Sequence, residues 1–388
     1  MIRPTFARVD LAAIESNLRA IADLLSAPRS SNLAPRTSDL GPRIIAVVKA
    51  NAYGHGASDV GLALERAGAA MLACADIEEG LTLRRAGVRI PILVFGALGV
   101  SDLDGVFEHD LTPTISTPSA ARALQDAARL RRSAASAGQA RLHCHLKIDT
   151  GMNRLGFRHD NLARTLPAIA ASPNLAIDAV YTHFATADDP ESEAFNDQRE
   201  RFERACASLP SIGLTPPMRH AANSAALLRD QRVWYDFVRP GLLLYGIVPP
   251  PLASTLPLRP ALSLHSRIVH VKGVRAGEGT GYGLTTTFDR PATIAIVPAG
   301  YADGLDRRLA GRGHMLVRGR RVPIVGSVCM DMTTIDVTGM DVSPGDEVVI
   351  VGDQGDESIG MREIAAAIGT IPYELLCRVG TRIERVYQ

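Results

Sequence analysis

The chain has 388 residues, of which 46% are hydrophobic and 21% charged, with a formal net charge of +1. This length predicts two domains, or one large barrel with additions, and the balanced charge argues against nucleic acid or an anionic membrane as a partner. No run approaches the ~18 to 20 apolar residues of a membrane span. The five cysteines are scattered and form no C-x-x-C pair, so we expect reduced thiols and a cytoplasmic protein.

The first 250 residues alternate between strand and helix patterns. The first helix follows Asp10, which can cap it, and residues 27–42 are rich in Pro, Ser and Asn and predict a long loop. Further helices are predicted at 57–67, 77–86, 118–132, 160–171 and 191–209. The predicted strands are Arg43–Lys49, Ala69–Ala75, Pro91–Phe95, Leu111–Ile115, Leu142–Asp149, Ala176–His183, Met218–Asn223 and Trp234–Arg239. Eight strands that alternate with helices favour a (β/α)8 TIM-type barrel over an open doubly wound sheet.

The remaining residues have a different pattern. Residues 248–261 carry five prolines and predict a linker. Strands joined by Gly-rich turns follow, with one helix at Met361–Ile368; the strands are predicted at Leu262–Val274, Thr293–Val297, His314–Val325, Thr333–Val337 and Glu347–Val351. We therefore expect a barrel over residues 11–250 and a second, mainly β domain over residues 251–388 together with residues 1–10.

Several predicted barrel strands end in reactive polar residues: Lys49, Asp149, His183, Asn223 and Arg239. Barrel enzymes place their chemistry at the C-terminal ends of the strands. Burial of Lys49 would favour its neutral amine, which can form a Schiff base with a carbonyl compound. Taken alone, however, Lys49 is also compatible with a strand-end lysine that reaches solvent.

The residues around Lys49 extend the argument. The stretch Val47-Val48-Lys49-Ala50-Asn51-Ala52-Tyr53-Gly54-His55-Gly56 resembles the signature of the alanine racemase family around the lysine that binds pyridoxal 5′-phosphate (PLP). The resemblance covers almost the whole chain, in further ordered blocks at residues 145–156, 182–185, 220–224, 238–241, 245–246, 281–283, 300–304, 329–331 and 371–374. It implies a barrel with a β domain, PLP as cofactor, and interconversion of L-alanine and D-alanine that supplies D-alanine for peptidoglycan.

The resemblance also assigns residues to the cofactor. Lys49 would bind PLP covalently, Arg239 would face the pyridine nitrogen, and His183 would orient Arg239. The phosphate would be held by Tyr53, Ser224, Gly241, Leu242 and Tyr373. The residues themselves are consistent with this, because Ser224 can cap a helix and contact a phosphate, and barrels commonly bind phosphate after strands seven and eight.

Racemisation requires a proton to leave one face of Cα and return on the other, for which two bases are geometrically simpler than one. The resemblance assigns these roles to Lys49 and Tyr282. A free tyrosine ionises only near pH ~10, so a tyrosine base needs cationic neighbours; by itself, Tyr282 is also compatible with a turn aromatic between two glycines.

The substrate carboxylate would be bound by Arg154 and Met330. Lys147 matches a lysine that is carbamylated in many relatives, where the added carboxylate holds the arginine. Tyr282, Tyr301, Met330 and Asp331 would approach the PLP of a partner subunit, which implies a homodimer with shared active sites.

Three alternatives remain open from the sequence: a racemase with broader amino-acid specificity, a PLP-binding protein of cofactor homeostasis, and a decarboxylase of similar architecture. The β domain with Tyr282 argues against the second, and Arg239 argues against the third, because such an enzyme would pair the pyridine nitrogen with a carboxylate. His143 and His145 could mimic a metal pair, but no third ligand has a useful spacing, so we expect no metal.

Overall fold

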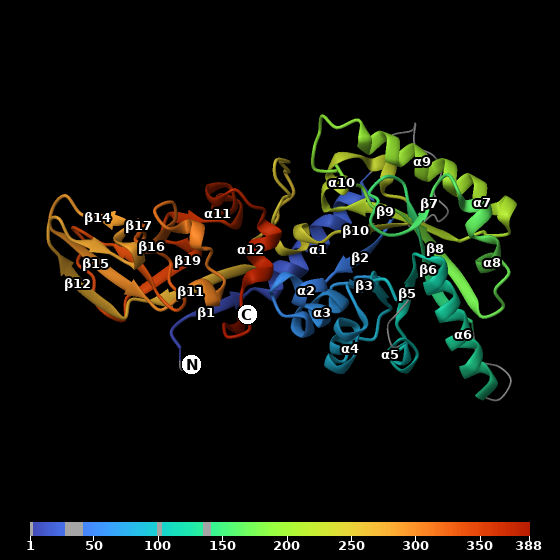
Figure 1. Cartoon of the computed structure of the whole chain (residues 1–388), viewed down its shortest axis with the longest axis horizontal. Helices are drawn as coiled ribbons and strands as arrows, with labels where there is room; N and C mark the ends of the chain where they lie inside the picture. Colours follow the sequence, from blue (N-terminus) through green and yellow to red (C-terminus); the bar gives the residue numbers. More distant parts are fainter. Residues whose placement is uncertain (1–2, 28–41, 99–102, 135–140) are drawn as a thin grey trace.

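The computed structural model describes residues 3–27, 42–98, 103–134 and 141–388 of the chain. It shows a barrel and a second, mainly β domain side by side (Figure 1). The predicted loop at 27–42 lies outside the described residues, apart from its two ends. Among the described residues, no helix has the length and apolar character needed to cross a membrane.

The barrel is closed by eight parallel strands. They are β2 Arg43–Val47, β3 Met71–Cys74, β4 Ile92–Val94, β5 Thr112–Ile115, β6 Leu142–Asp149, β8 Leu175–Tyr181, β9 Met218–Asn223 and β10 Phe237–Arg239. Each pairs with its neighbour in this order, and β10 pairs with β2 to close the ring. The predicted barrel is therefore confirmed. The short strand β7 (Phe157–Arg158) adds to the end of β6.

Helices surround the ring (Figure 1). They are α1 Leu11–Ser26, α2 Lys49–Tyr53, α3 Ala57–Arg66, α4 Ile77–Ala86, α5 Asp104–Glu108, α6 Pro118–Ala134, α7 Leu162–Thr165, α8 Pro167–Ala170, α9 Ala194–Ser208 and α10 Ser224–Arg229, with 3-10 turns η1 Leu209–Ile212, η2 Gln231–Val233 and η3 Leu242–Tyr245. Asp10 caps α1 as predicted, since its side chain accepts from Ala13 N. The helix predicted over 160–171 is two short helices, because Pro167 cannot donate the backbone hydrogen bond that would join them.

The β domain is built on one long sheet of order β12-β15-β18-β17-β16-β19-β11-β1-β21, with β20 beside β19. Its strands are β1 Phe6–Val9, β11 Leu262–Arg267, β12 His270–Val274, β15 Ala292–Val297, β16 His314–Val317, β17 Arg320–Val325, β18 Thr333–Asp336, β19 Glu347–Gln354, β20 Glu357–Ile359 and β21 Glu384–Tyr387. A small hairpin joins β13 (Gly279–Thr280) to β14 (Thr286–Thr287). The 3-10 turns are η4 Tyr282–Leu284, η5 Tyr301–Asp303 and η6 Arg307–Leu309, and the two helices are α11 Met361–Ile368 and α12 Pro372–Arg378.

Two strand predictions in this domain were wrong. The run Leu262–Val274 is two strands, and these pair with different partners: β11 with β1 and β19, and β12 with β15. The run His314–Val325 is a hairpin that turns at Arg318 and Gly319, both at positive φ. In the second run, Gly319 within Arg-Gly-Arg-Arg was a local signal of the turn. Helix α12, which begins at Pro372, was not predicted.

Lys49 does not end a strand as predicted. It lies two residues beyond the end of β2 and opens α2, whose next four residues have φ values of 51° to 54°. This is a left-handed turn, a conformation that costs roughly 1–2 kcal/mol per non-glycine residue. Tertiary hydrogen bonds must hold it, and they fix where Lys49 and Tyr53 lie.

Candidate active site

Arg239, at the end of β10, is a buried cation held by neutral acceptors. Its Nη2 atom donates to Thr182 O and Ala221 O, both at 2.9 Å, and lies 3.2 Å from Nδ1 of His183. Its Nη1 atom lies 2.8 Å from His220 Nδ1. Burial lowers the pKa of Arg239 to about 10, so the guanidinium stays charged at neutral pH. It presents donors and no acceptor.

The hydrogen bond from Arg239 fixes two further histidines. Because arginine can only donate, Nδ1 of His220 accepts, and its Nε2–H then donates to Nδ1 of His145 at 3.0 Å. The Tyr181 ring stacks on His220 with centroids 4.6 Å apart. Burial lowers the pKa of His145 to about 3 and that of His220 well below its ordinary value. Both imidazoles are therefore neutral, and together they set the orientation of Arg239.

An anion cradle lies beside the end of the same strand. The Oγ atom of Ser224 accepts from Gly241 N at 2.9 Å and from Leu243 N at 3.4 Å. Ser224 is thus not the helix cap; that role belongs to Asn223, whose side chain accepts from Ala226 N. A Cβ on Gly241 would lie 2.5 Å from Tyr53 Oη, so any larger residue would require the Tyr53 ring to shift.

Five residues predicted to contact the phosphate lie around this cradle. They are Tyr53, Ser224, Gly241 and Leu242, together with Tyr373, whose ring contacts that of Tyr53. Leu242 follows Gly241 in η3, and the Tyr53 ring lies 5.9 Å from that of Tyr373 in α12. Hydroxyl groups and backbone N–H groups at one point suit a phosphate group. The residues present therefore fit PLP, with a phosphate at Ser224 and Gly241 and a donor at Arg239.

Lys49 lies in a cationic surrounding. Burial, followed by the positive charge of Arg154, lowers the pKa of Lys49, while Cys377 and Glu79 act in the opposite direction. A lowered pKa favours the neutral amine that a carbonyl group requires. His183, whose pKa burial holds well below its ordinary value, also feels the charges of Arg239, Lys147, Arg154 and Lys49, in that order. The structure therefore gathers these five predicted residues at one end of the barrel.

Lys147 and Arg154 differ in exposure. Lys147 is 7% exposed, and burial together with Arg154 and Arg239 lowers its pKa to about 8. Arg154 is exposed and, among the described residues, no hydrogen-bond partner of its guanidinium is found. Asn153 adopts φ 55°, a left-handed conformation that asparagine tolerates. An exposed cation beside the barrel mouth is suited to a carboxylate.

Among the predicted site residues of the β domain, Tyr373 lies beside Tyr53 of the barrel. In the described part of the chain, no contact with Lys49 is found for the others: Tyr282, Tyr301, Met330 and Asp331. Tyr282 lies in the turn between β13 and β14, and β14 is at the end of the β domain away from the barrel (Figure 1). Tyr282 is 77% exposed, and Tyr301, Met330, Met332 and Leu284 are exposed as well. Backbone hydrogen bonds hold the segment of Tyr301 beside that of Met330: Tyr301 N donates to Cys329 O, and Ala302 N donates to Met330 O. Asp331 accepts from Arg382 at 2.7 Å. Exposed apolar groups of this kind mark a contact surface.

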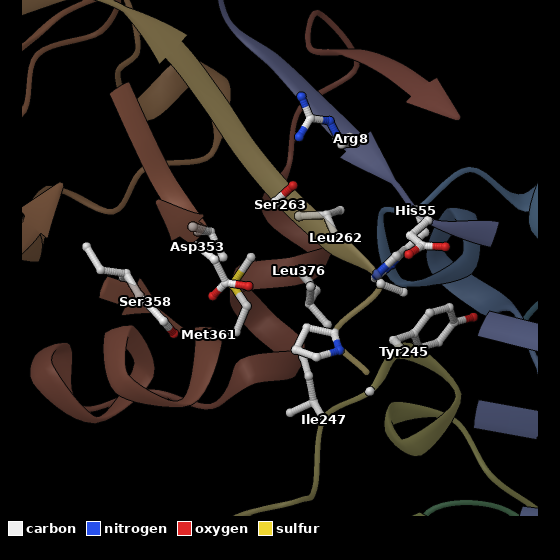
Figure 2. A pocket seen from close by; sticks show the side chains of 18 of the residues that line it. Arg8, His55, Tyr245, Ile247, Leu262, Ser263, Asp353, Ser358, Met361 and Leu376 are labelled. Atoms are coloured by element: carbon white, nitrogen blue, oxygen red, sulfur yellow. The ribbon is translucent and has the colours of Figure 1, made fainter. Parts of the chain in front are cut away.

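A cavity of about 470 Å³ lies between the two domains, apart from the candidate active site. It is lined by His55, Tyr245, Leu262, Met361 and Leu376, and not by Lys49, Ser224 or Arg239 (Figure 2). His55 separates this cavity from the turn of α2, because its Nδ1 lies 3.0 Å from Ala52 O and 2.9 Å from Tyr53 O.

Sequence reasoning missed His145 and His220 as parts of the site. Lys147 pairs in register with Tyr181, which in turn pairs with His220. His220 in turn pairs with Phe237, two residues before Arg239, and a single sequence contains no signal for this register. The period-two spacing of His145 and Lys147 on one strand was a weak signal that both point into the barrel.

Comparisons with known proteins agree along the chain. Residues 9–249 match the family model "Alanine racemase, N-terminal domain", and residues 261–387 match "Alanine racemase, C-terminal domain". An alanine racemase of Symbiobacterium thermophilum is 40% identical over 389 residues, which cover 100% of this chain and 97% of that protein.

Solved structures are similar over the same length. The alanine racemase of D-cycloserine-producing Streptomyces lavendulae has a TM-score of 0.91 at 34% identity and covers 100% of this chain and 98% of its own. The alanine racemase of Bartonella henselae, solved with covalently bound pyridoxal phosphate, has a TM-score of 0.84 at 26% identity, with 99% of both chains covered.

Proposed function

Because the chain belongs to the alanine racemase family, we propose that it interconverts L-alanine and D-alanine with PLP as cofactor. The observation that carries this proposal is the buried Arg239, held by neutral imidazoles and carbonyl oxygens, beside the cradle of Ser224 and Gly241. The proposed domain limits are a barrel over residues 11–250 and a β domain over 251–388 with 1–10, in which β1 supplies a strand.

In this proposal the cofactor is held at three points. Lys49 binds it covalently, Ser224, Gly241, Leu242, Tyr53 and Tyr373 hold its phosphate, and Arg239 donates to its pyridine nitrogen. PLP, when bound, withdraws electrons from the substrate Cα and so makes the Cα–H acidic. Arg239 donates hydrogen bonds and has no acceptor for the N–H of a protonated ring. It would therefore favour an unprotonated pyridine nitrogen, which would limit electron withdrawal and disfavour transamination.

Two residues move the proton. Lys49 exchanges it on one face of Cα, and the partner subunit's Tyr282 exchanges it on the other. Arg154 binds the substrate carboxylate, and the backbone N–H of the partner subunit's Met330 donates to the same group. The exposure of Tyr282, Tyr301 and Met330 supports a homodimer with shared sites.

We further propose that Lys147 is carbamylated and that its carboxylate then holds Arg154. The lowered pKa of Lys147 supports this, because only a neutral amine adds to carbon dioxide. Five free thiols support a cytoplasmic location, where D-alanine would enter peptidoglycan synthesis.

The test is D-alanine formation from L-alanine by the purified protein with added PLP, beside L-serine, L-lysine and a control without PLP. We expect PLP-dependent conversion with a preference for alanine. Equal rates with serine or lysine would indicate a broader racemase. No conversion of any amino acid by the PLP-loaded protein would refute the proposal and favour a role in cofactor homeostasis.

A further inference from the structure

The left-handed turn that follows Lys49 is held by a carboxylate from the next βα unit of the barrel. Glu79 lies in the first turn of α4, and its Oε1 accepts from Ala50 N at 2.6 Å. Its Oε2 accepts from Ala75 N at 2.7 Å, just beyond the end of β3. One side chain thus joins the residue after Lys49 to the neighbouring barrel strand.

Helix capping does not account for this arrangement. The cap of α4 is Asp76, whose side chain accepts from Glu79 N at 2.9 Å. In a capping box, a glutamate at this position would accept from the backbone N–H of the cap residue itself. Here its two oxygens instead bind Ala75 N–H and the distant Ala50 N–H. The second bond adds nothing to α4, so it serves the turn.

The turn needs such support. Ala50, Asn51, Ala52 and Tyr53 are all left-handed, although three of them are not residues that favour this conformation. Further support comes from the Asn51 side chain, which accepts from Ala57 N at 2.8 Å, and from His55, which contacts the carbonyl groups of Ala52 and Tyr53. Within the turn, Gly54 N donates to Ala50 O at 3.0 Å. Among these side-chain contacts, the one from Glu79 reaches the residue that follows Lys49.

We propose that Glu79 is a positioning residue for Lys49: its carboxylate fixes the turn that aims the amine and supplies the negative charge that faces it. This inference rests on the proposed role of Lys49. The titratable groups around the Lys49 amine come from several elements of the barrel and from α12, namely Arg154, Lys147, His183, Cys377 and Glu79. Among them, Glu79 is a carboxylate that also contacts the backbone of the turn.

Three variants separate the two effects. Glu79→Gln keeps the length of the side chain and one acceptor oxygen but removes the charge. Glu79→Asp keeps the charge but is one methylene too short to reach both segments. Glu78→Gln is the matched control, because Glu78 lies in the same first turn of α4 and is exposed. Thermal unfolding of each variant establishes that it is folded.

The first measurement is hydrogen–deuterium exchange of peptides covering residues 48–57 in the full-length protein. Loss of a hydrogen bond to a charged acceptor should speed exchange of the Ala50 amide about 10- to 100-fold in Glu79→Asp and Glu79→Gln. Glu78→Gln should exchange like the wild type. Unchanged exchange in both Glu79 variants would overturn the positioning role.

The second measurement is the pH dependence of Lys49 acetylation in the protein without PLP, followed by mass spectrometry. Removing the carboxylate charge should move the midpoint to lower pH in Glu79→Gln, but not in Glu79→Asp or Glu78→Gln. A midpoint in Glu79→Gln equal to that of the control would overturn the electrostatic role. Neither measurement uses racemisation, so each decides this inference even if alanine is not the substrate.

Discussion

Buried neutral histidines should make the protein unstable in mild acid. His55, His145, His183 and His220 have lowered pKa values, in each case mainly through burial, to about 4 for His55 and about 3 for His145. In the unfolded chain they titrate near 6.5. Below that pH the unfolded state binds more protons than the folded state, so stability is complete above pH ~6.5 and falls as the pH decreases.

The magnitude follows from the four groups. A change of one pH unit corresponds to about 1.4 kcal/mol for each fully titrating group. Because titration begins near pH 6.5, each histidine removes about 1.9 kcal/mol between pH 7 and pH 5, and four remove about 7.5 kcal/mol. His159 and His265, whose pKa values burial also lowers, act in the same direction. This is comparable to the whole stability of a typical domain. Asp303 and Asp306, whose pKa values lie below normal, lose their contribution only below pH ~4 and do not interfere.

The assay is urea unfolding of the PLP-free protein at pH 7, 6 and 5, at one protein concentration. Its signal is the fluorescence of Trp234, the one tryptophan, which is 2% exposed. His55→Gln should remove about a quarter of this pH dependence. A loss below ~2 kcal/mol between pH 7 and pH 5, the share of a single histidine, would refute the reasoning.

Further predictions concern the proposed chemistry. Lys49→Ala should abolish the visible absorbance of covalently bound PLP; an unchanged spectrum would exclude the cofactor assignment. Tyr282→Phe should slow solvent hydrogen exchange at Cα from one alanine enantiomer more than from the other, and equal wild-type rates would exclude this base. Mixing inactive Lys49→Ala and Tyr282→Phe proteins should restore activity, because a mixed dimer has one intact shared site. Subunit exchange without recovery of activity would contradict shared sites. ¹³C-bicarbonate should give a carbamate NMR signal that disappears in Lys147→Arg; a signal that persists would place the carbamate elsewhere. Arg239→Glu should lower racemisation by about 100-fold and produce pyruvate by transamination, and a lack of pyruvate would contradict the role given to the guanidinium.

The barrel was predictable because its signals are local. Each strand is a short apolar run, and the reactive residues Asp149, Asn223 and Arg239 end their strands as expected. The turn after Lys49 was not predictable, because Ala-Asn-Ala-Tyr has no preference for a left-handed conformation. It depends on Glu79, 29 residues away, in a contact that exists only once the barrel has formed.

In the candidate site too, some residues could be predicted from local sequence signals and others could not. Residues whose roles depend on motif and strand position, such as Ser224 and Gly241, do lie together in the structure. The places of His145 and His220 depend on the register between strands, and the proposed meeting of Lys49 with Tyr282 would depend on a second chain. Neither strand register nor contacts between subunits can be predicted from the residue pattern of one sequence.

Strand β1 also bears on how the molecule would respond to a cut. It lies between β11 and β21 in the sheet of the β domain, yet it continues at Asp10 directly into α1 of the barrel. Asn17 of α1 in turn exchanges side-chain hydrogen bonds with the backbone of Arg259 in the linker. A protease nick between residues 252 and 256 would therefore leave two fragments held together by a shared sheet, and they should co-purify as a nicked complex and separate only in denaturant.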